Sequence, residues 1–217
     1  MTMTHNSPTE RLLIDAAFGE PADSATVDRT AEALKARNFN VAVVSDGTAA
    51  RDLLLSFIPE GAEVGEGASQ TLDAIGVTET VEKSGRYQAI RPRTRAMDRA
   101  TQSREIRKLG SAPDIQINSV QAVTEDGRLV VASFGGSQLG PIVSGAGKVI
   151  LVVGAQKIVP DLDTAFRRIE EYNLPIEDVK LQAAYGIHSA INKLLVINAE
   201  VAPSRITVIL VREPVGV

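Results

Sequence analysis

The sequence predicts an α/β protein with a Rossmann-like core, in which a mainly parallel sheet carries helices on both faces. Several strand-length runs are apolar throughout, which is typical of strands covered on both faces. Between these runs apolar residues recur at helical spacing, so strands and helices alternate along the chain. With 217 residues, 44% of them hydrophobic, the chain is long enough to bury a core without disulfides.

The N-terminal part of the chain predicts a tail followed by a helix, a strand and a second helix. Residues 1–22 are polar and predict a tail. Asp23 is a good N-cap for a helix, and the apolar run 41–45 then has strand length without alternation. A second helix is expected over about 48–58. No linker divides the remainder, so residues 23–217 are expected to form one domain.

The second half of the chain continues the alternation. Asp126–Gly127, within the loosely alternating segment 115–132, is a strong signal for an antiparallel hairpin. Pro160 precedes a helical stripe. Further apolar runs of strand length lie at 148–154, 194–198 and 206–211. The runs expected to share one mainly parallel sheet are 41–45, 149–153 and 194–198.

Composition excludes several kinds of site. The chain has no cysteine, which rules out disulfides, thiolate zinc sites, iron–sulfur ligation and a cysteine nucleophile. Its two histidines, His5 and His188, are far apart in sequence, so no metal site is expected. No flavin or dinucleotide fingerprint is present, so we expect no bound cofactor and a colourless protein.

The same composition limits location and partners. No apolar run approaches the roughly 20 residues of a membrane helix, and the N-terminus lacks a secretory signal, so a cytoplasmic protein without membrane insertion is expected. The net charge of −4 and the 4% aromatic content argue against nucleic acid. Segment 86–108 is locally basic, typical of a solvated helix face; the alternative is a rim that attracts an anion. The sequence leaves open whether the protein forms a homo-oligomer.

A glycine-rich stretch at 64–76, VGEGASQTLDAIG, raises the question of a ligand site. Gly65 and Gly67 permit close backbone approach, and Ser69 is a natural N-cap for a short helix that Gly76 ends. A strand, a glycine loop and a helix N-terminus together can hold an anion. The pattern matches neither established phosphate-binding motif, so by itself it is typical of an ordinary turn.

A second glycine-rich element at 132–148 makes the ligand interpretation stronger. Gly135 and Gly136 follow an apolar strand, and Ser137 can cap what comes next. If both elements follow strands of one parallel sheet, they lie side by side at its carboxyl edge, where ligands bind in such folds. The interpretation as two ordinary turns stays open.

Other polar residues have two interpretations each. Lys157 ends a buried strand, where it would meet an anion or begin a surface loop, and Asn118 would present its amide to a ligand or to a turn. His188 and Asn192 share a face if they lie on a helix, and His188 is then a candidate acid or base, although a structural histidine is favoured. Asp126 is assigned to turn chemistry rather than catalysis.

Three stretches together resemble one protein family. They are VGEGASQTLDAIGV, DIQINSVQAVTEDGRLV and VILVVGAQKIVPDLDTAFRRIEE, in this order. This set is similar to the lactate-utilisation (LUD) domain family, and the ending HSAINKLLVINAEVAPSRITVILVREPVG resembles one branch of it, lactate utilisation protein C-like. The resemblance covers roughly residues 25–217, and VVGAQKIVPDLDTA and NSVQAVTEDGRL are its most specific parts.

The resemblance implies both a fold and a function. The fold would be akin to ribose phosphate isomerase and the coenzyme A transferases, and the function would be to support oxidation of L-lactate to pyruvate within a multi-protein system. Iron–sulfur subunits of that system would be the partners, and a small anion the ligand. No catalytic residue can be carried over. Two alternatives stay open: an isomerase or transferase for a phosphorylated or acyl substrate, and a non-catalytic interaction subunit.

Overall fold

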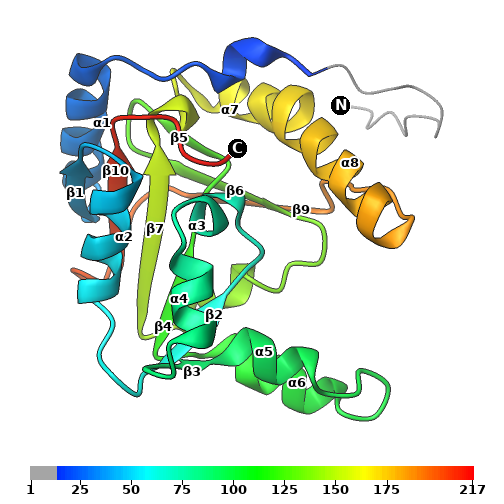
Figure 1. The fold of residues 1–217 in the computed structure, drawn as a ribbon. Coiled ribbons are helices and arrows are strands. Elements are labelled where there is room, and N and C mark those ends of the chain that lie inside the picture. The colour runs from blue at the N-terminus through cyan, green and yellow to red at the C-terminus, as the bar shows by residue number, and fades with distance from the viewer. Residues whose placement is uncertain (1–13) are drawn as a thin grey trace.

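The computed structural model describes residues 14–217 and contains a six-stranded, wholly parallel sheet (Figure 1). His5 lies outside the described residues. In spatial order the strands are β1 (Asn40–Val44), β10 (Ile206–Val211), β7 (Lys148–Gly154), β4 (Ile115–Asn118), β2 (Glu63–Glu66) and β3 (Gln88–Ala89). The predicted α/β class with a mainly parallel sheet is therefore confirmed.

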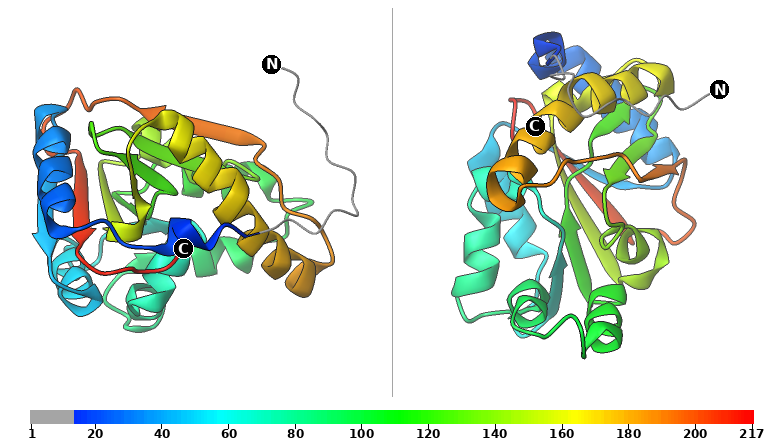
Figure 2. Two further views of the ribbon diagram at one scale, coloured as in Figure 1. Left: turned by 90° about the horizontal axis from the view of Figure 1, so that it is seen from above. Right: turned by 90° about the vertical axis from the view of Figure 1, so that its right-hand side faces the viewer.

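Helices cover both faces of this sheet, as its apolar strands predict. Along β7 the side chains alternate: Val149 and Leu151 enter one core cluster, while Ile150 and Val152 enter the other. The first cluster is closed by α1 (Ser24–Ala36). The second is closed by three helices, α2 (Gly47–Ser56), α3 (Gln70–Ala74) and α4 (Val77–Lys83). Figure 2 shows the same layers from two further sides.

A second, four-stranded sheet lies against the face that α1 covers. Its strands, in spatial order, are β8 (Ile158–Val159), β5 (Ala122–Thr124), β6 (Leu129–Ser133) and β9 (Lys193–Ile197). Strands β5 and β6 form the antiparallel hairpin that Asp126–Gly127 predicts, with Gly127 at φ 88°. Leu129 and Val131 face the first core cluster, and Val130 faces α7 (Leu162–Arg168) on the outside.

The placement of residues 194–198 in the six-stranded sheet is wrong. These residues form β9, which pairs antiparallel with β6 at the edge of the second sheet. Both faces of β9 are partly covered, since Leu195 packs on the first core cluster and Val196 on the third. An apolar run without alternation indicates that both faces of a strand are covered, but it does not indicate which sheet the strand joins.

The remaining helices lie around the two sheets. The helical stripe after Pro160 extends further than predicted, because α7 continues through η4 (Ile169–Asn173) into α8 (Leu174–Tyr185). The others are α5 (Ile90–Arg95), α6 (Ser103–Ser111), η1 (Ala16–Gly19), η2 (Pro141–Gly145) and η3 (Ala155–Lys157). Asp23 caps α1 as predicted, accepting a hydrogen bond from the Thr26 amide. None of the helices within residues 14–217 has the length and apolar character needed to cross a bilayer.

The basic segment 86–108 is largely neutralised by glutamates. Arg86, Arg91, Arg93 and Arg95 pair with glutamates that precede the segment in the sequence, at nitrogen–oxygen distances between 3.0 and 3.8 Å. A count of charges within the segment misses these partners because they come from β2, α4 and the loop before β2. The segment therefore carries less free positive charge than its sequence indicates.

Candidate functional site

The connections of the parallel sheet create a crevice at one point of its carboxyl edge. Strand β2 leads to β3 on one side, whereas its neighbour β4 leads to β7 on the other. The chain after β2 enters α3 and α4 on one face, and the chain after β4 enters the β5–β6 hairpin on the opposite face. Adjacent strands whose connections diverge in this way leave a topological switch point, where ligands bind in open α/β sheets.

A cavity of about 260 Å³ lies at this switch point. Its walls come from the loop after β2, the end of β4, the segment after β6, the turn after β7, and α8. Five of the residues singled out from the sequence line it: Ser69, Asn118, Gly135, Ser137 and Lys157. Four others, Gly65, Gly67, Gly136 and His188, do not line it.

Gly65 and Gly67 serve the close packing of strands and loops. A Cβ on Gly67 would lie 2.5 Å from Asn118 Oδ1 and 3.2 Å from Gln138 Cβ. A Cβ on Gly65 would lie 2.4 Å from Gln116 Oε1. The Gly67 amide donates to Asn118 Oδ1 at 3.1 Å, so this N–H is already committed within the protein. The glycines let β2 and β4 approach each other, and the Gly67 amide does not face a ligand.

Ser69 caps α3 as the sequence predicts, because its hydroxyl oxygen accepts a hydrogen bond from the Leu72 amide at 3.3 Å. The helix has only five residues, so its dipole is small. Gly76, at φ 75°, follows the end of α3 as predicted, and α4 begins directly after it. The hydroxyl hydrogen of Ser69 is left for a group in the cavity.

The second glycine-rich element reaches the cavity from a different sheet. Gly135, Gly136 and Ser137 follow β6 of the four-stranded sheet, so the premise that both elements follow strands of one sheet is wrong. They meet the first element because the β5–β6 hairpin folds over the carboxyl edge of β4. Gly136 adopts φ 88° and donates its amide to Ser133 Oγ at 2.8 Å, and Ser137 does not cap a helix.

Lys157 is the central side chain of the cavity wall. It follows β7 and is only 2% exposed, so it does not begin a surface loop. Its Nζ donates to Thr71 Oγ1 at 2.9 Å and to Ser119 Oγ at 3.0 Å. Burial lowers the pKa of Lys157 well below the usual lysine value, and the charge of the nearby Arg168 lowers it further.

Arg168 is the second buried cation. It has no exposed surface, and it donates to the carbonyls of Gln121 and Gln156 and to Asn173 Oδ1. Burial lowers its pKa to about 10. Its Nη2 has no hydrogen-bond partner within residues 14–217, and Tyr172 lies beneath the guanidinium with 5.0 Å to the ring centroid.

No carboxylate within residues 14–217 forms an ion pair with either of these two cations. Among the ion pairs of the described chain, none involves Lys157 or Arg168. The acidic side chain in the cavity wall is Glu177 of α8, which is half-buried and accepts a hydrogen bond from Gln70 Nε2 at 3.4 Å. Buried charges in proteins are normally paired, so the side of the cavity formed by Lys157, with Arg168 behind it, could accommodate a negatively charged group.

Three residues of this arrangement were not identified from the sequence. Thr71 lies inside the glycine-rich stretch 64–76, and Ser119 follows Asn118. Hydroxyl residues at the ends of strands and helices are too common to indicate a binding site. The burial of Arg168 could have been predicted from the spacing of the apolar residues around it. This residue is three residues after Ala165 and next to Ile169, which places it on the buried side of α7.

His188 is not on a helix, so the condition under which it would share a face with Asn192 is not met. Residues 187–192 have no regular secondary structure, and His188 Nδ1 lies 3.1 Å from Asp178 Oδ2 on α8. Asp178 also accepts the Ser189 amide at 2.6 Å. The contact fastens the segment after α8, which agrees with a structural histidine. In residues 14–217 no group of acidic or histidine side chains is placed to hold a metal ion.

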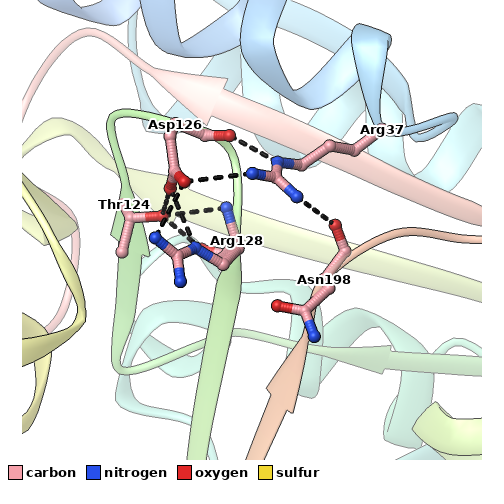
Figure 3. A network of polar contacts seen from close by, with 5 residues as sticks. All are labelled: Arg37, Thr124, Asp126, Arg128 and Asn198. Atoms are coloured by element: carbon pink, nitrogen blue, oxygen red, sulfur yellow. Dashed lines mark hydrogen bonds and ion pairs between the residues drawn. The ribbon is translucent and has the colours of Figure 1, made fainter.

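Asp126 takes part in turn chemistry (Figure 3), and it does not line the cavity. Its carboxylate accepts hydrogen bonds from Thr124 and Arg128 and pairs with Arg37 at 3.0 Å, and Arg128 in particular lowers its pKa. Arg37 also donates to the Asn198 carbonyl at 2.9 Å. The network therefore ties the hairpin turn to the end of α1 and the end of β9.

Comparisons with known proteins agree with this architecture. The family model described as LUD domain matches residues 27–211. The crystal structure of a DUF162 family protein from Deinococcus radiodurans is similar with a TM-score of 0.54 and 10% identity, over 88% of this chain and 99% of that one. A ribose 5-phosphate isomerase from Plasmodium falciparum gives a TM-score of 0.32 with 12% identity over 52% of each chain, too low to support an argument. A search of curated proteins by sequence found no match.

Proposed function

Because this chain belongs to the LUD domain family, we propose that it supports the oxidation of L-lactate to pyruvate and that its cavity binds a small carboxylate of this kind. The observation that supports the proposal is the pair of buried cations, Lys157 and Arg168, beside a cavity without a buried counter-ion. A carboxylate in the cavity would supply the missing negative charge.

Uncommitted hydrogen-bond donors in the wall favour an oxygen-rich ligand. Within residues 14–217 no acceptor is assigned to the hydroxyl hydrogen of Ser69, to Gln121 Nε2 or to Asn173 Nδ2, and all three residues line the cavity. Charge-assisted hydrogen bonds to a carboxylate are about twice as strong as neutral ones. These donors and the two cations together suit a small hydroxy or oxo acid.

The size of the cavity limits the ligand. Pockets for drug-sized molecules span about 300–1,000 Å³. At about 260 Å³ the cavity suits a metabolite of a few heavy atoms, and it is too small to enclose a dinucleotide or coenzyme A. Binding of the ligand is therefore proposed to involve its carboxylate and neighbouring oxygen, without a large cofactor.

Electron transfer is proposed to occur in a partner. Oxidation of lactate releases two electrons, and this chain has no cysteine to hold an iron–sulfur cluster. Subunits that carry such clusters are the proposed acceptors. The transferase alternative would need a carboxylate nucleophile, and Glu177 on the rim is the acidic side chain that the described wall offers.

Calorimetric titration of the purified protein tests the proposal. L-lactate and pyruvate should bind, and the neutral amide of pyruvate should bind about tenfold or more weakly, because a charge-assisted hydrogen bond contributes roughly 1.5–3 kcal/mol. Inorganic phosphate and ribose 5-phosphate form the comparison arms. Equal binding of pyruvate and its amide would contradict the proposal. Preference for ribose 5-phosphate would favour the isomerase alternative. Absence of binding to every compound would favour the non-catalytic interaction subunit.

A further inference from the structure

We propose that Lys157 forms a reversible imine with the carbonyl carbon of a 2-oxo acid bound in the cavity. This inference rests on the proposed carboxylate-binding function and extends it to covalent chemistry. The observations that support it are the burial of the side chain, its place in the cavity wall, and the two hydroxyl groups that hold its nitrogen.

The two hydroxyl groups fix how Lys157 Nζ makes its hydrogen bonds. Ser119 Oγ donates its hydrogen to the Val152 carbonyl at 2.7 Å, and Thr71 Oγ1 donates to the Val215 carbonyl at 3.3 Å. Each hydroxyl therefore has only lone pairs left for Lys157, so Nζ donates one hydrogen to each. A neutral amine has two hydrogens and one lone pair, and both hydrogens are used by these bonds.

The remaining position on the nitrogen is where a ligand atom can approach. In the neutral amine this position holds the lone pair, which is the nucleophile in imine formation. Neither hydroxyl nor any other described group accepts or donates there. Because Lys157 forms part of the cavity wall, a carbonyl carbon in the cavity is the atom placed to meet it.

The surroundings ease the loss of the proton that the charged Lys157 carries, and this loss frees the nucleophilic lone pair. Burial and the neighbouring Arg168 both lower the pKa of Lys157, whereas no carboxylate among the described residues lies within ion-pair distance to raise it. A lysine desolvated beside another cation is an established arrangement for amine nucleophiles. Of the charged groups near the cavity, Arg168 comes from α7 and Glu177 from α8, and Glu177 is the half-buried rim residue.

The step balances without an oxidant or reductant. The Nζ lone pair forms a bond to the carbonyl carbon, the carbonyl π electrons move to oxygen, and a proton from nitrogen converts this oxygen to a hydroxyl. The hydroxyl then leaves as water with the second nitrogen proton, and the carbon–nitrogen double bond remains. A 2-hydroxy acid has no carbonyl beside its carboxylate and cannot react, so the imine distinguishes pyruvate from lactate.

Borohydride trapping of the full chain tests the imine. Incubation with pyruvate and sodium borohydride should add one label per chain. The increase in mass should equal that of pyruvic acid less one oxygen atom, because reduction restores the two hydrogen atoms that the amine loses in the condensation. Peptide mass spectrometry should place the label on Lys157. L-lactate with borohydride should give no label. Lys157→Arg, which lacks the primary amine, should lose the label.

A matched lysine variant controls for non-specific reduction. Lys193 is exposed and lies beside Gly136, outside the cavity wall, so Lys193→Met should label as fully as the wild type. Binding of pyruvate without any label, or a label on another lysine, overturns the imine and leaves the proposed function intact. Absence of pyruvate binding together with absence of the label overturns the imine and the proposed function alike. Should Lys157→Arg not fold, the position of the label on the wild-type chain decides.

Discussion

Two polar networks in this protein differ in how their charges are compensated. In the hairpin network Arg37 and Arg128 both pair with Asp126, and all three side chains are partly exposed (Figure 3). In the cavity network Lys157 and Arg168 are buried, and their partners are hydroxyls, carbonyls and an amide oxygen. Every cation of the first network has a carboxylate partner, whereas the cations of the second have none among the described residues.

The difference is the one expected between a network that fixes a turn and a network with the proposed ligand-binding role. Exposed ion pairs contribute little to stability, and an arrangement such as the hairpin network serves mainly to fix a turn. Burying an uncompensated cation costs free energy, and such groups persist where they act on a ligand. Substitutions in the two networks should therefore have effects of different size and sign.

The largest effect is expected for Arg168→Leu. The substitution removes the donors to the buried Gln121 and Gln156 carbonyls. Each buried acceptor left without a partner costs roughly 1–3 kcal/mol, so the free energy of unfolding should fall by about 2–5 kcal/mol. Urea denaturation measures this. A loss no greater than that of an exposed ion-pair variant would show that Arg168 is not a structural centre of the cavity.

An effect of opposite sign is expected for Lys157→Met. Methionine has a similar shape and no charge, and both hydroxyl partners keep their own acceptors, so the free energy of unfolding at neutral pH should rise by about 1–4 kcal/mol. Pyruvate binding should be lost in the same variant. A destabilised Lys157→Met protein would contradict the description of Lys157 as an uncompensated buried cation.

The pH dependence of this difference sharpens the test. The folded pKa of Lys157 lies below the usual value of 10.5. Between those two values the unfolded chain holds a proton that the folded chain lacks, so the stability of the wild type rises with pH in that window. The advantage of Lys157→Met should therefore shrink as the pH approaches 10.5. Denaturation of both proteins across the alkaline range measures it.

The smallest effect is expected for Arg37→Ala. Its guanidinium pairs with Asp126 and donates to the Asn198 carbonyl, but the side chain is 29% exposed and Asp126 keeps Arg128. The free energy of unfolding should fall by about 1 kcal/mol or less, and pyruvate binding should be unchanged. If this variant lost as much stability as Arg168→Leu, the contrast between the two networks would not hold.

The sequence by itself determined the class of fold and most elements. The continuous apolar runs 148–154 and 206–211 are strands with those same bounds, because a strand covered on both faces must be apolar throughout. Asp126–Gly127 marked the hairpin, since glycine readily adopts the positive φ that the turn requires at position 127. Local signals of this kind depend only on neighbouring residues, and the chain shows them directly.

Only the tertiary structure decided which sheet each strand joins and which polar residues meet. Run 194–198 looked like the central strands, yet β9 became the edge of the second sheet. Lys157 looked like a loop residue at a strand end, but Thr71, Ser119 and Arg168 surround it from other segments. Burial and charge compensation depend on partners 11 to 86 residues away in the chain, and only packing brings these partners together.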